Sequence, residues 1–101
     1  MWLFVLYDLP TETRKERKTA ADFRKSLVKD GFLMFQFSIY IRFCPSIENA
    51  EVHIKRTKYN LPKTGSVCIL RITDKQFGDL ELFEGEKETE LIQQPPLLEL
   101  F

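Results

Sequence analysis

The hydrophobic pattern of the first third of the chain predicts a strand followed by a helix. Residues 2–7 (WLFVLY) are continuously apolar and include aromatic and β-branched side chains, which is typical of a central strand buried on both faces. Pro10 has no backbone N–H and cannot join a ladder, so the strand is expected to end near Asp8. Over residues 12–29, apolar side chains recur at spacings of three and four, which predicts a helix whose buried stripe is Ala20, Phe23 and Leu27.

The ends of this helix also have recognisable signals. Thr11 or Thr13 can cap its N-terminus, and Gly31 supplies the residue that commonly follows a helix in the left-handed conformation. Residues 32–43 (FLMFQFSIYIRF) then alternate with a period of two, the pattern of a strand. The alternation fits one long strand or two segments broken near residues 36–38, and the pattern alone leaves both open.

The second half of the chain predicts a helix and two strands. Residues 46–60 are expected to form a helix with Ser46 as N-cap and an inner stripe of Ile47, Ala50, Ile54 and Leu61. Residues 66–73 (SVCILRIT) predict a strand, residues 74–75 a turn, and residues 77–83 (FGDLELF) a final short strand.

The predicted order is β-α-β-(β)-α-β-β. It indicates an α/β (α+β) protein of ferredoxin-like type, β-α-β-β-α-β with an extra C-terminal strand, whose two helices lie on one face of a mainly antiparallel sheet. Residues 1–83 form the folded domain, and residues 84–101 form an acidic, then apolar, C-terminal tail.

Composition narrows the class of protein. A chain of 101 residues with 44% apolar and 30% charged residues suits one globular domain. Cys44 and Cys68 lack the spacing of a zinc or redox site and are expected to be small buried apolar residues in a reducing cytoplasm. The apolar run before Asp8 is too short for a secretory signal, and no run approaches the ~20 residues of a membrane span, so no membrane partner is expected.

The net charge of zero conceals an uneven distribution. Residues 1–80 contain 14 Lys and Arg against 9 Asp and Glu, whereas residues 81–101 contain one Lys against six Glu. A basic body attracts polyanions. The candidate nucleic-acid contacts are Arg14, Arg17 and Lys18 on the first helix, which otherwise form an ordinary solvated face. Tyr40 and Arg42, on the polar side of the 32–43 pattern, are further candidates for contact with nucleic acid or a partner.

Asp8 is the candidate catalytic and metal-binding residue. It ends an apolar strand just before a basic helix, and its carboxylate is suited to Mg²⁺, although a simple turn-capping role is the alternative. One carboxylate makes a poor magnesium site, so a symmetric homodimer that places Asp8 beside its own copy is the simplest way to complete it. His53 is the only histidine and has no ligand-spaced partner, so a surface or packing role is expected.

The tail changes character along its length. Residues 84–90 (EGEKETE) read as an acidic spacer, and residues 91–101 (LIQQPPLLELF) become apolar again. Such a segment is costly to leave in water, so it is expected to pack on its own dimer or to dock on a partner. The apolar residues proposed for docking are Leu97, Leu98, Leu100 and Phe101.

Four segments together resemble a known family. They are Y-D-L-P at 7–10, R-K-E-R-K at 14–18, F-Q-F-S-I-Y at 35–40 and I-T-D-K-Q-F-G at 72–78. Their order and spacing over residues 1–83 are similar to the CRISPR-associated Cas-two family, in the branch that accompanies the large single-effector (type II) systems. No single motif would be sufficient, and the tail lies outside the resemblance.

The resemblance implies a ferredoxin-like homodimer with a Mg²⁺ site formed by Asp8 of both subunits. It implies partnership with the Cas-one integrase, in which one dimer bridges two integrase dimers and supports duplex DNA during spacer acquisition. It also implies metal-dependent endonuclease activity on RNA or DNA. It leaves open whether Asp8 takes part in cleavage or has no catalytic role during adaptation. The alternative function is a free-standing, toxin-type endoribonuclease on the same fold. A regulatory ferredoxin-like module is a third alternative, but it leaves Asp8 and the basic helix unexplained.

Overall fold

The structure is a computed structural model, and it describes residues 1–85. The candidate docking residues of the tail, Leu97, Leu98, Leu100 and Phe101, lie outside the described residues. Within residues 1–85 the chain forms four strands and three helices in the order β1 (Trp2–Asp8), α1 (Arg14–Lys29), β2 (Leu33–Gln36), β3 (Ile39–Phe43), α2 (Ile47–Tyr59), β4 (Ser66–Ile72) and α3 (Asp74–Gly78).

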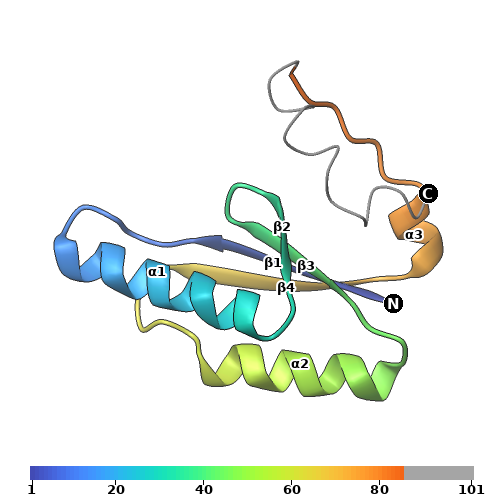
Figure 1. Ribbon diagram of the computed structural model, residues 1–101, viewed down its shortest axis with the longest axis horizontal. Helices are drawn as coiled ribbons and strands as arrows, with labels where there is room; N and C mark the ends of the chain where they lie inside the picture. The colour runs from blue at the N-terminus through green and yellow to red at the C-terminus, as the bar shows by residue number, and fades with distance from the viewer. Residues whose placement is uncertain (86–101) are drawn as a thin grey trace.

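The four strands form one sheet in the order β2-β3-β1-β4, and all three pairings are antiparallel. Helices α1 and α2 lie together on one side of this sheet (Figure 1). The predicted ferredoxin-like arrangement is therefore confirmed. β1 occupies an interior position, where Leu3 and Val5 are almost completely buried, as its uninterrupted apolar run predicts.

The helix boundaries follow from local capping. Thr13, rather than Thr11, caps α1: its hydroxyl accepts a hydrogen bond from Glu16 N at 3.0 Å, while the Glu16 carboxylate accepts one from Thr13 N at 2.9 Å. Ser46 caps α2 as predicted and accepts from Asn49 N. Gly31, which follows α1, has a φ of 88°, in the left-handed region that favours glycine.

Residues 32–43 form two strands rather than one. β2 and β3 pair as a hairpin in which Gln36 lies opposite Ile39, and the register shifts between Met34 and Gln36. The two residues between the strands are Phe37 and Ser38, and Ser38 has a φ of 63°. The strict alternation of apolar residues therefore stops at the turn.

The predicted strand over residues 77–83 is wrong. Residues Asp74–Gly78 form the short helix α3, and residues 79–83 belong to no strand. Thr73 and Gln76 form a reciprocal capping box that starts the helix where a turn was expected. The ring of Phe77 then stacks on Trp2 with centroids 3.9 Å apart, so its apolar character serves packing rather than a ladder.

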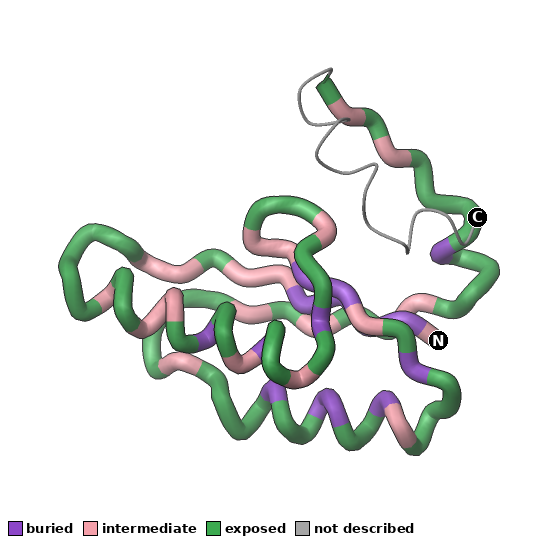
Figure 2. Tube along the Cα trace, in the orientation of Figure 1, coloured by how far each residue is buried: buried purple, intermediate pink, exposed green. Residues whose placement is uncertain are grey.

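The predicted inner stripe of α2 is correct only in its middle. Ala50 and Ile54 are buried, whereas Ile47 and Leu61 are exposed. Ile47 is the first helical residue and Leu61 lies beyond the C-cap, so neither belongs to the central turns that pack on the sheet (Figure 2).

The two cysteines lie in different environments. Cys44 is buried, as predicted, and burial raises the pKa of its thiol. Cys68 is exposed, so the expectation that both would be buried is wrong for this residue. Among residues 1–85, no helix is long and apolar enough to cross a membrane.

Candidate functional site at the end of strand β1

Asp8 is the last residue of β1, and its side chain is exposed. Successive side chains of a strand point to opposite faces. Val5 packs in the cluster that includes residues of α1 and α2, so the even-numbered residues of β1 face the other side of the sheet. Asp8 therefore shares the face opposite the helices with Trp2 and Phe4.

Strand β4 and the turn before it hold the backbone around Asp8 in place. Asp8 pairs with Ser66 at the start of β4. The preceding residue, Gly65, has a φ of 87°, and a Cβ there would lie 2.7 Å from both the Asp8 carbonyl oxygen and Leu9 Cδ2. Only glycine accommodates this approach, so the turn before β4 helps to position the end of β1.

The face that carries Asp8 is incompletely covered. Phe77 of α3 packs with Trp2, Phe4 and Ile41 at one part of this face. Elsewhere large apolar side chains stay open to solvent: Leu70 is 43% exposed, and Leu33 is 51% exposed. Leu70 lies opposite Phe4, and Leu33 lies opposite Ile41, so both belong to this face of the sheet. We call it the open face; its exposed apolar members are Leu33, Phe43, Cys68 and Leu70.

A single chain does not assemble a metal centre around Asp8. Among residues 1–85, no group of three or more His, Cys, Asp or Glu side chains is placed to hold an ion. Asp8 does offer an exposed carboxylate, the donor that Mg²⁺ prefers, next to an apolar surface suited to assembly. The residues present therefore fit a shared site better than an intramolecular one.

The three predicted cations of α1 are exposed but differ in their contacts. Arg17 Nη1 donates to the carbonyl oxygens of Thr11 and Glu12, both at 3.0 Å, and so ties down the loop that follows Asp8. Lys18 Nζ lies 3.0 Å from Asp22 Oδ2 one turn along the helix. No hydrogen bond or ion pair engages the Arg14 side chain within residues 1–85, which leaves its guanidinium available to a phosphate.

The two candidates on β3 lie away from Asp8. Tyr40 is 3% exposed in the helix-side core, where its ring stacks on Tyr7 at 6.1 Å, so the expected contact with nucleic acid or a partner is wrong for Tyr40. Burial and the neighbouring Tyr40 raise the pKa of Tyr7. Arg42 is half-buried against Gly31 and pairs in register with Leu3, near the opposite end of β1 from Asp8.

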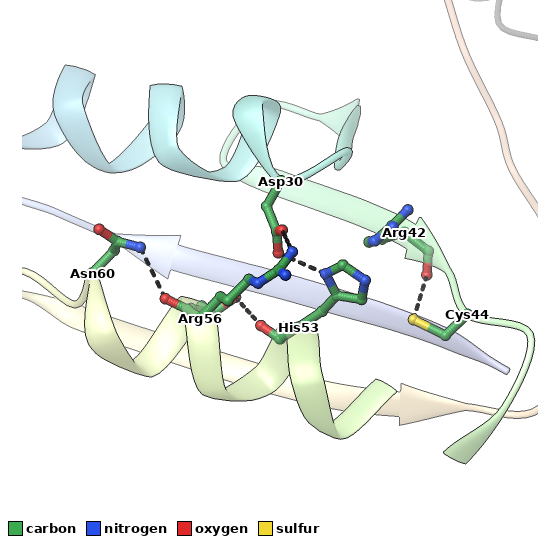
Figure 3. A network of polar contacts seen from close by, with 7 residues as sticks. Asp30, Arg42, Cys44, His53, Arg56 and Asn60 are labelled. Atoms are coloured by element: carbon green, nitrogen blue, oxygen red, sulfur yellow. Dashed lines mark hydrogen bonds and ion pairs between the residues drawn. The ribbon is translucent and has the colours of Figure 1, made fainter. Parts of the chain in front are cut away.

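A partly buried ionic network joins the helices and was not predicted from the sequence (Figure 3). His53 is 4% exposed, and its Nδ1 lies 2.7 Å from Asp30 Oδ2, while Arg56 Nη1 donates to Asp30 Oδ1 at 2.7 Å. Burial acts to raise the pKa of Asp30, but the hydrogen bonds and charges of Arg56 and His53 outweigh it and lower that pKa.

The network connects the C-cap of α1 to α2. Of the surface and packing roles that the sequence left open for His53, its burial supports the packing role. The signal that could have found it is the spacing of His53 and Arg56, which places both on one side of α2. Its partner, Asp30, is 23 residues away from His53 in the sequence, and no local pattern links them.

Comparison with known proteins identifies the family. The family model described as "CRISPR associated protein Cas2" matches residues 1–80. A protein of Flavobacterium psychrophilum named "CRISPR-associated endoribonuclease Cas2" is 60% identical over 100% of this chain and 88% of its own length. A relative of the same name from Parvibaculum lavamentivorans is 50% identical over the whole of both chains.

The fold gives a consistent result. The crystal structure of Streptococcus pyogenes Cas2 at pH 6.5 matches with a TM-score of 0.60 and 24% identity, covering 83% of this chain and all of that chain. At this identity the match supports the fold, while the family model and the more similar relatives carry the assignment. The chain belongs to the CRISPR-associated protein Cas2 family.

Proposed function

We propose that this chain acts in CRISPR adaptation as a homodimer that binds duplex DNA and bridges two dimers of the Cas1 integrase. We further propose that paired Asp8 residues give the dimer Mg²⁺-dependent endonuclease activity on RNA or DNA. The observation that carries both parts is the position of Asp8, exposed at the edge of an apolar sheet face that residues 1–85 leave partly open.

The open face supports the homodimer. Leu70 and Phe43 are each nearly half exposed on the face of the sheet opposite the helices, where contact with a second copy would remove them from water. In a two-fold dimer the same patch of both copies meets at the axis. Residues at the edge of this face, Asp8 among them, can then lie near their own copies.

The chemistry follows from two carboxylates. Bound between them, Mg²⁺ would lower the pKa of a water molecule and stabilise charge on a phosphodiester. The Asp8 pair would hold the ion, and the loop fixed by Arg17 and Gly65 would keep the carboxylates in place. Without the ion the two carboxylates would repel each other.

Nucleic-acid binding is supported by the exposed cations. Arg14 lies at the first turn of α1, shortly after Asp8 in the chain, and Lys18 follows one turn later. Contacts of this kind with phosphates depend on salt, with log K falling by about 0.9 per log salt for each phosphate neutralised on duplex DNA. The Arg14→Ala variant should therefore reduce this slope by about one contact in a salt titration.

A second candidate function is a free-standing, toxin-type endoribonuclease; its RNA-cleaving part agrees with the names of the relatives, which call those proteins endoribonucleases. It uses the same Asp8 pair but needs no integrase. Co-purification separates the two: a scaffold retains the integrase through size-exclusion chromatography, whereas a free-standing ribonuclease elutes alone.

The Asp8→Asn variant tests the shared catalytic site. Cleavage of RNA and DNA should fall by at least about 100-fold in Mg²⁺, because the neutral amide no longer provides a charged ligand. Light scattering should show the same dimer as the unmodified chain. Asp22→Asn is the matched control, since Asp22 is an exposed carboxylate whose observed partner is Lys18, and it should retain full cleavage. Equal cleavage by the Asp8→Asn variant would show that the activity resides elsewhere.

A further inference from the structure

A hollow in the helix layer takes no part in the candidate site at Asp8. It lies between the C-terminal ends of α1 and α2 and has a volume of about 410 Å³. The residues that line it are Ser26, Lys29, Asp30, Arg56, Tyr59 and Asn60. Sites for small molecules typically have about 300–1,000 Å³ and a few placed polar groups. The hollow therefore has the size for one small molecule or for one unit of a polymer.

The hollow carries positive charge that its own carboxylate does not neutralise. Asp30 is the only acid among the lining residues, and both of its oxygens are already bonded, one to His53 and the other to Arg56. Arg56 is 60% exposed and reaches Asp30 through one terminal nitrogen, so its other donors are open to a ligand. Within residues 1–85, no hydrogen bond or ion pair engages the side chain of Lys29. An anion would therefore find unused donors from both helices.

Tyr59 adds an aromatic surface to the same hollow. It is the last residue of α2 and is 90% exposed, and no ring contact engages it within residues 1–85. The helix dipole favours cations at a C-terminus, which accounts for Lys29 and Arg56 in the last turns of their helices. It does not account for an exposed aromatic ring beside them. A ring next to phosphate-binding cations is the combination that a nucleotide requires.

We propose that this hollow binds a nucleotide, with the base stacked on Tyr59 and the phosphate held by Lys29 and Arg56. Stacking on an aromatic ring tolerates every base, and the two cations provide charge-assisted hydrogen bonds to phosphate oxygens. Asn60 donates through Nδ2 to the carbonyl oxygen of Arg56, which leaves its amide oxygen to accept from a base amino group. The site is separate from Asp8. Free nucleotides and single nucleic-acid strands share this chemistry, and their relative affinities separate the two sources.

Competition against a fluorescent ATP analogue tests the proposal. The full, unmodified chain is kept in EDTA, so that no Mg²⁺ reaches Asp8, and the competitors are ATP, inorganic triphosphate and tetra-adenylate. ATP should bind roughly 5- to 100-fold more tightly than triphosphate, because only ATP has a base to stack. If tetra-adenylate binds more than about tenfold more tightly than ATP, the ligand is a strand; a smaller difference identifies a free nucleotide.

Substitutions separate recognition of the base from recognition of the phosphate. Tyr59→Ala should weaken ATP binding to the level of triphosphate and leave triphosphate binding unchanged, whereas Tyr59→Phe should retain the affinity for ATP. Lys29→Gln should weaken both ligands by roughly 3- to 10-fold. Phe37→Ala and Lys25→Gln are the matched controls and should bind as the unmodified chain does. Phe37 is 92% exposed in the β2–β3 turn, Lys25 is exposed one turn earlier on α1, and neither lines the hollow.

Three results would overturn the proposal. If Tyr59→Ala binds ATP as tightly as the unmodified chain, the ring does not stack on a base. If ATP and triphosphate bind equally, the hollow does not recognise a base. If ATP shows no saturable binding up to about 5 mM, the hollow holds no nucleotide. Cleavage at Asp8 is measured separately, in Mg²⁺ with the Asp8→Asn variant, so the failure of this proposal and the failure of the proposed function are distinguishable.

Discussion

The two faces of the sheet differ in how completely residues 1–85 cover them. On one face, Leu3 and Val5 of β1 pack against Phe23 and Leu27 of α1, and all four are at most 2% exposed. On the other face, Trp2 and Phe4 are covered by Phe77, while Leu70 and Leu33 remain about half exposed. The helix-covered face, called the closed face below, is a buried core. The open face has apolar residues of the same kind, but several of them are exposed.

The difference assigns the stability of the single chain to the helix-covered face and the candidate site to the open face. The helix-covered face has the burial needed to hold one chain together. The open face carries Asp8, the one candidate catalytic residue, and is the surface proposed to contact a second copy. A change on the closed face should therefore act mainly on unfolding, and a change on the open face mainly on assembly.

The largest effect is expected when a charge enters the open face. Leu70→Glu should abolish the dimer at micromolar concentrations, because a carboxylate without a partner would be buried between two copies. Sedimentation or light scattering measures the change. Val52→Glu is the control, since Val52 is 44% exposed on α2, as open as Leu70 but in the helix layer. A Leu70→Glu dimer of unchanged strength would show that the copies meet elsewhere.

The same substitution, leucine to alanine, made once on each face compares how much the two faces contribute to the free energy of unfolding. Leu27→Ala should lower the free energy of unfolding by about 2–5 kcal/mol, because Leu27 is fully buried and leaves a cavity. Leu70→Ala, studied at concentrations where the dimer dissociates, should cost less than about 1 kcal/mol, since much of its surface is already in water. Urea denaturation provides both values, and similar losses would contradict the distinction between the faces.

A smaller effect than that of Leu27→Ala is expected at the ionic network between Asp30 and α2. Asp30→Asn should lower the free energy of unfolding by about 1–3 kcal/mol at neutral pH, because His53 and Arg56 lose their shared carboxylate. Folding lowers the pKa of Asp30, so its stabilisation is complete above the ordinary carboxyl pKa and is lost as the pH falls through the lowered value.

Measuring the effect of Asp30→Asn at several pH values provides a control for the role of the Asp30 charge. The difference between Asp30→Asn and the unmodified chain should disappear in strongly acidic solution, where both side chains are neutral. Asp22→Asn, which disrupts an exposed pair with Lys18, should cost less than about 1 kcal/mol at any pH. A difference at Asp30 that persisted in acid would assign its role to packing rather than charge.

Much of the fold was predictable because its signals are local. The apolar run of β1, the helical periodicity ending at Gly31 and the N-cap Ser46 each involve residues within a few positions of one another. Such patterns reflect backbone geometry and desolvation, which act on neighbouring residues. The position of Asp8 at the end of a strand was predictable for the same reason.

The errors arose where a local pattern has two structural solutions. Alternation around Tyr40 fits a strand with either face toward the helices, and the pairing of Tyr40 with Val5 of β1 places this ring on the helix side. The segment with Phe77 is apolar enough for a strand, but Thr73 and Gln76 cap a helix, a signal present in the sequence and overlooked. Here pairing and packing selected the outcome.

The sequence by itself determined the antiparallel α+β plan, the acid that ends β1, the basic first helix and, through its motifs, the resemblance that the family model bears out. Only the tertiary structure decided that Asp8 lies on the open face of the sheet. It also decided that Asp30 meets His53 across two helices. The physical reason is range: capping and periodicity depend on adjacent residues, whereas exposure and proximity depend on which distant segments pack together.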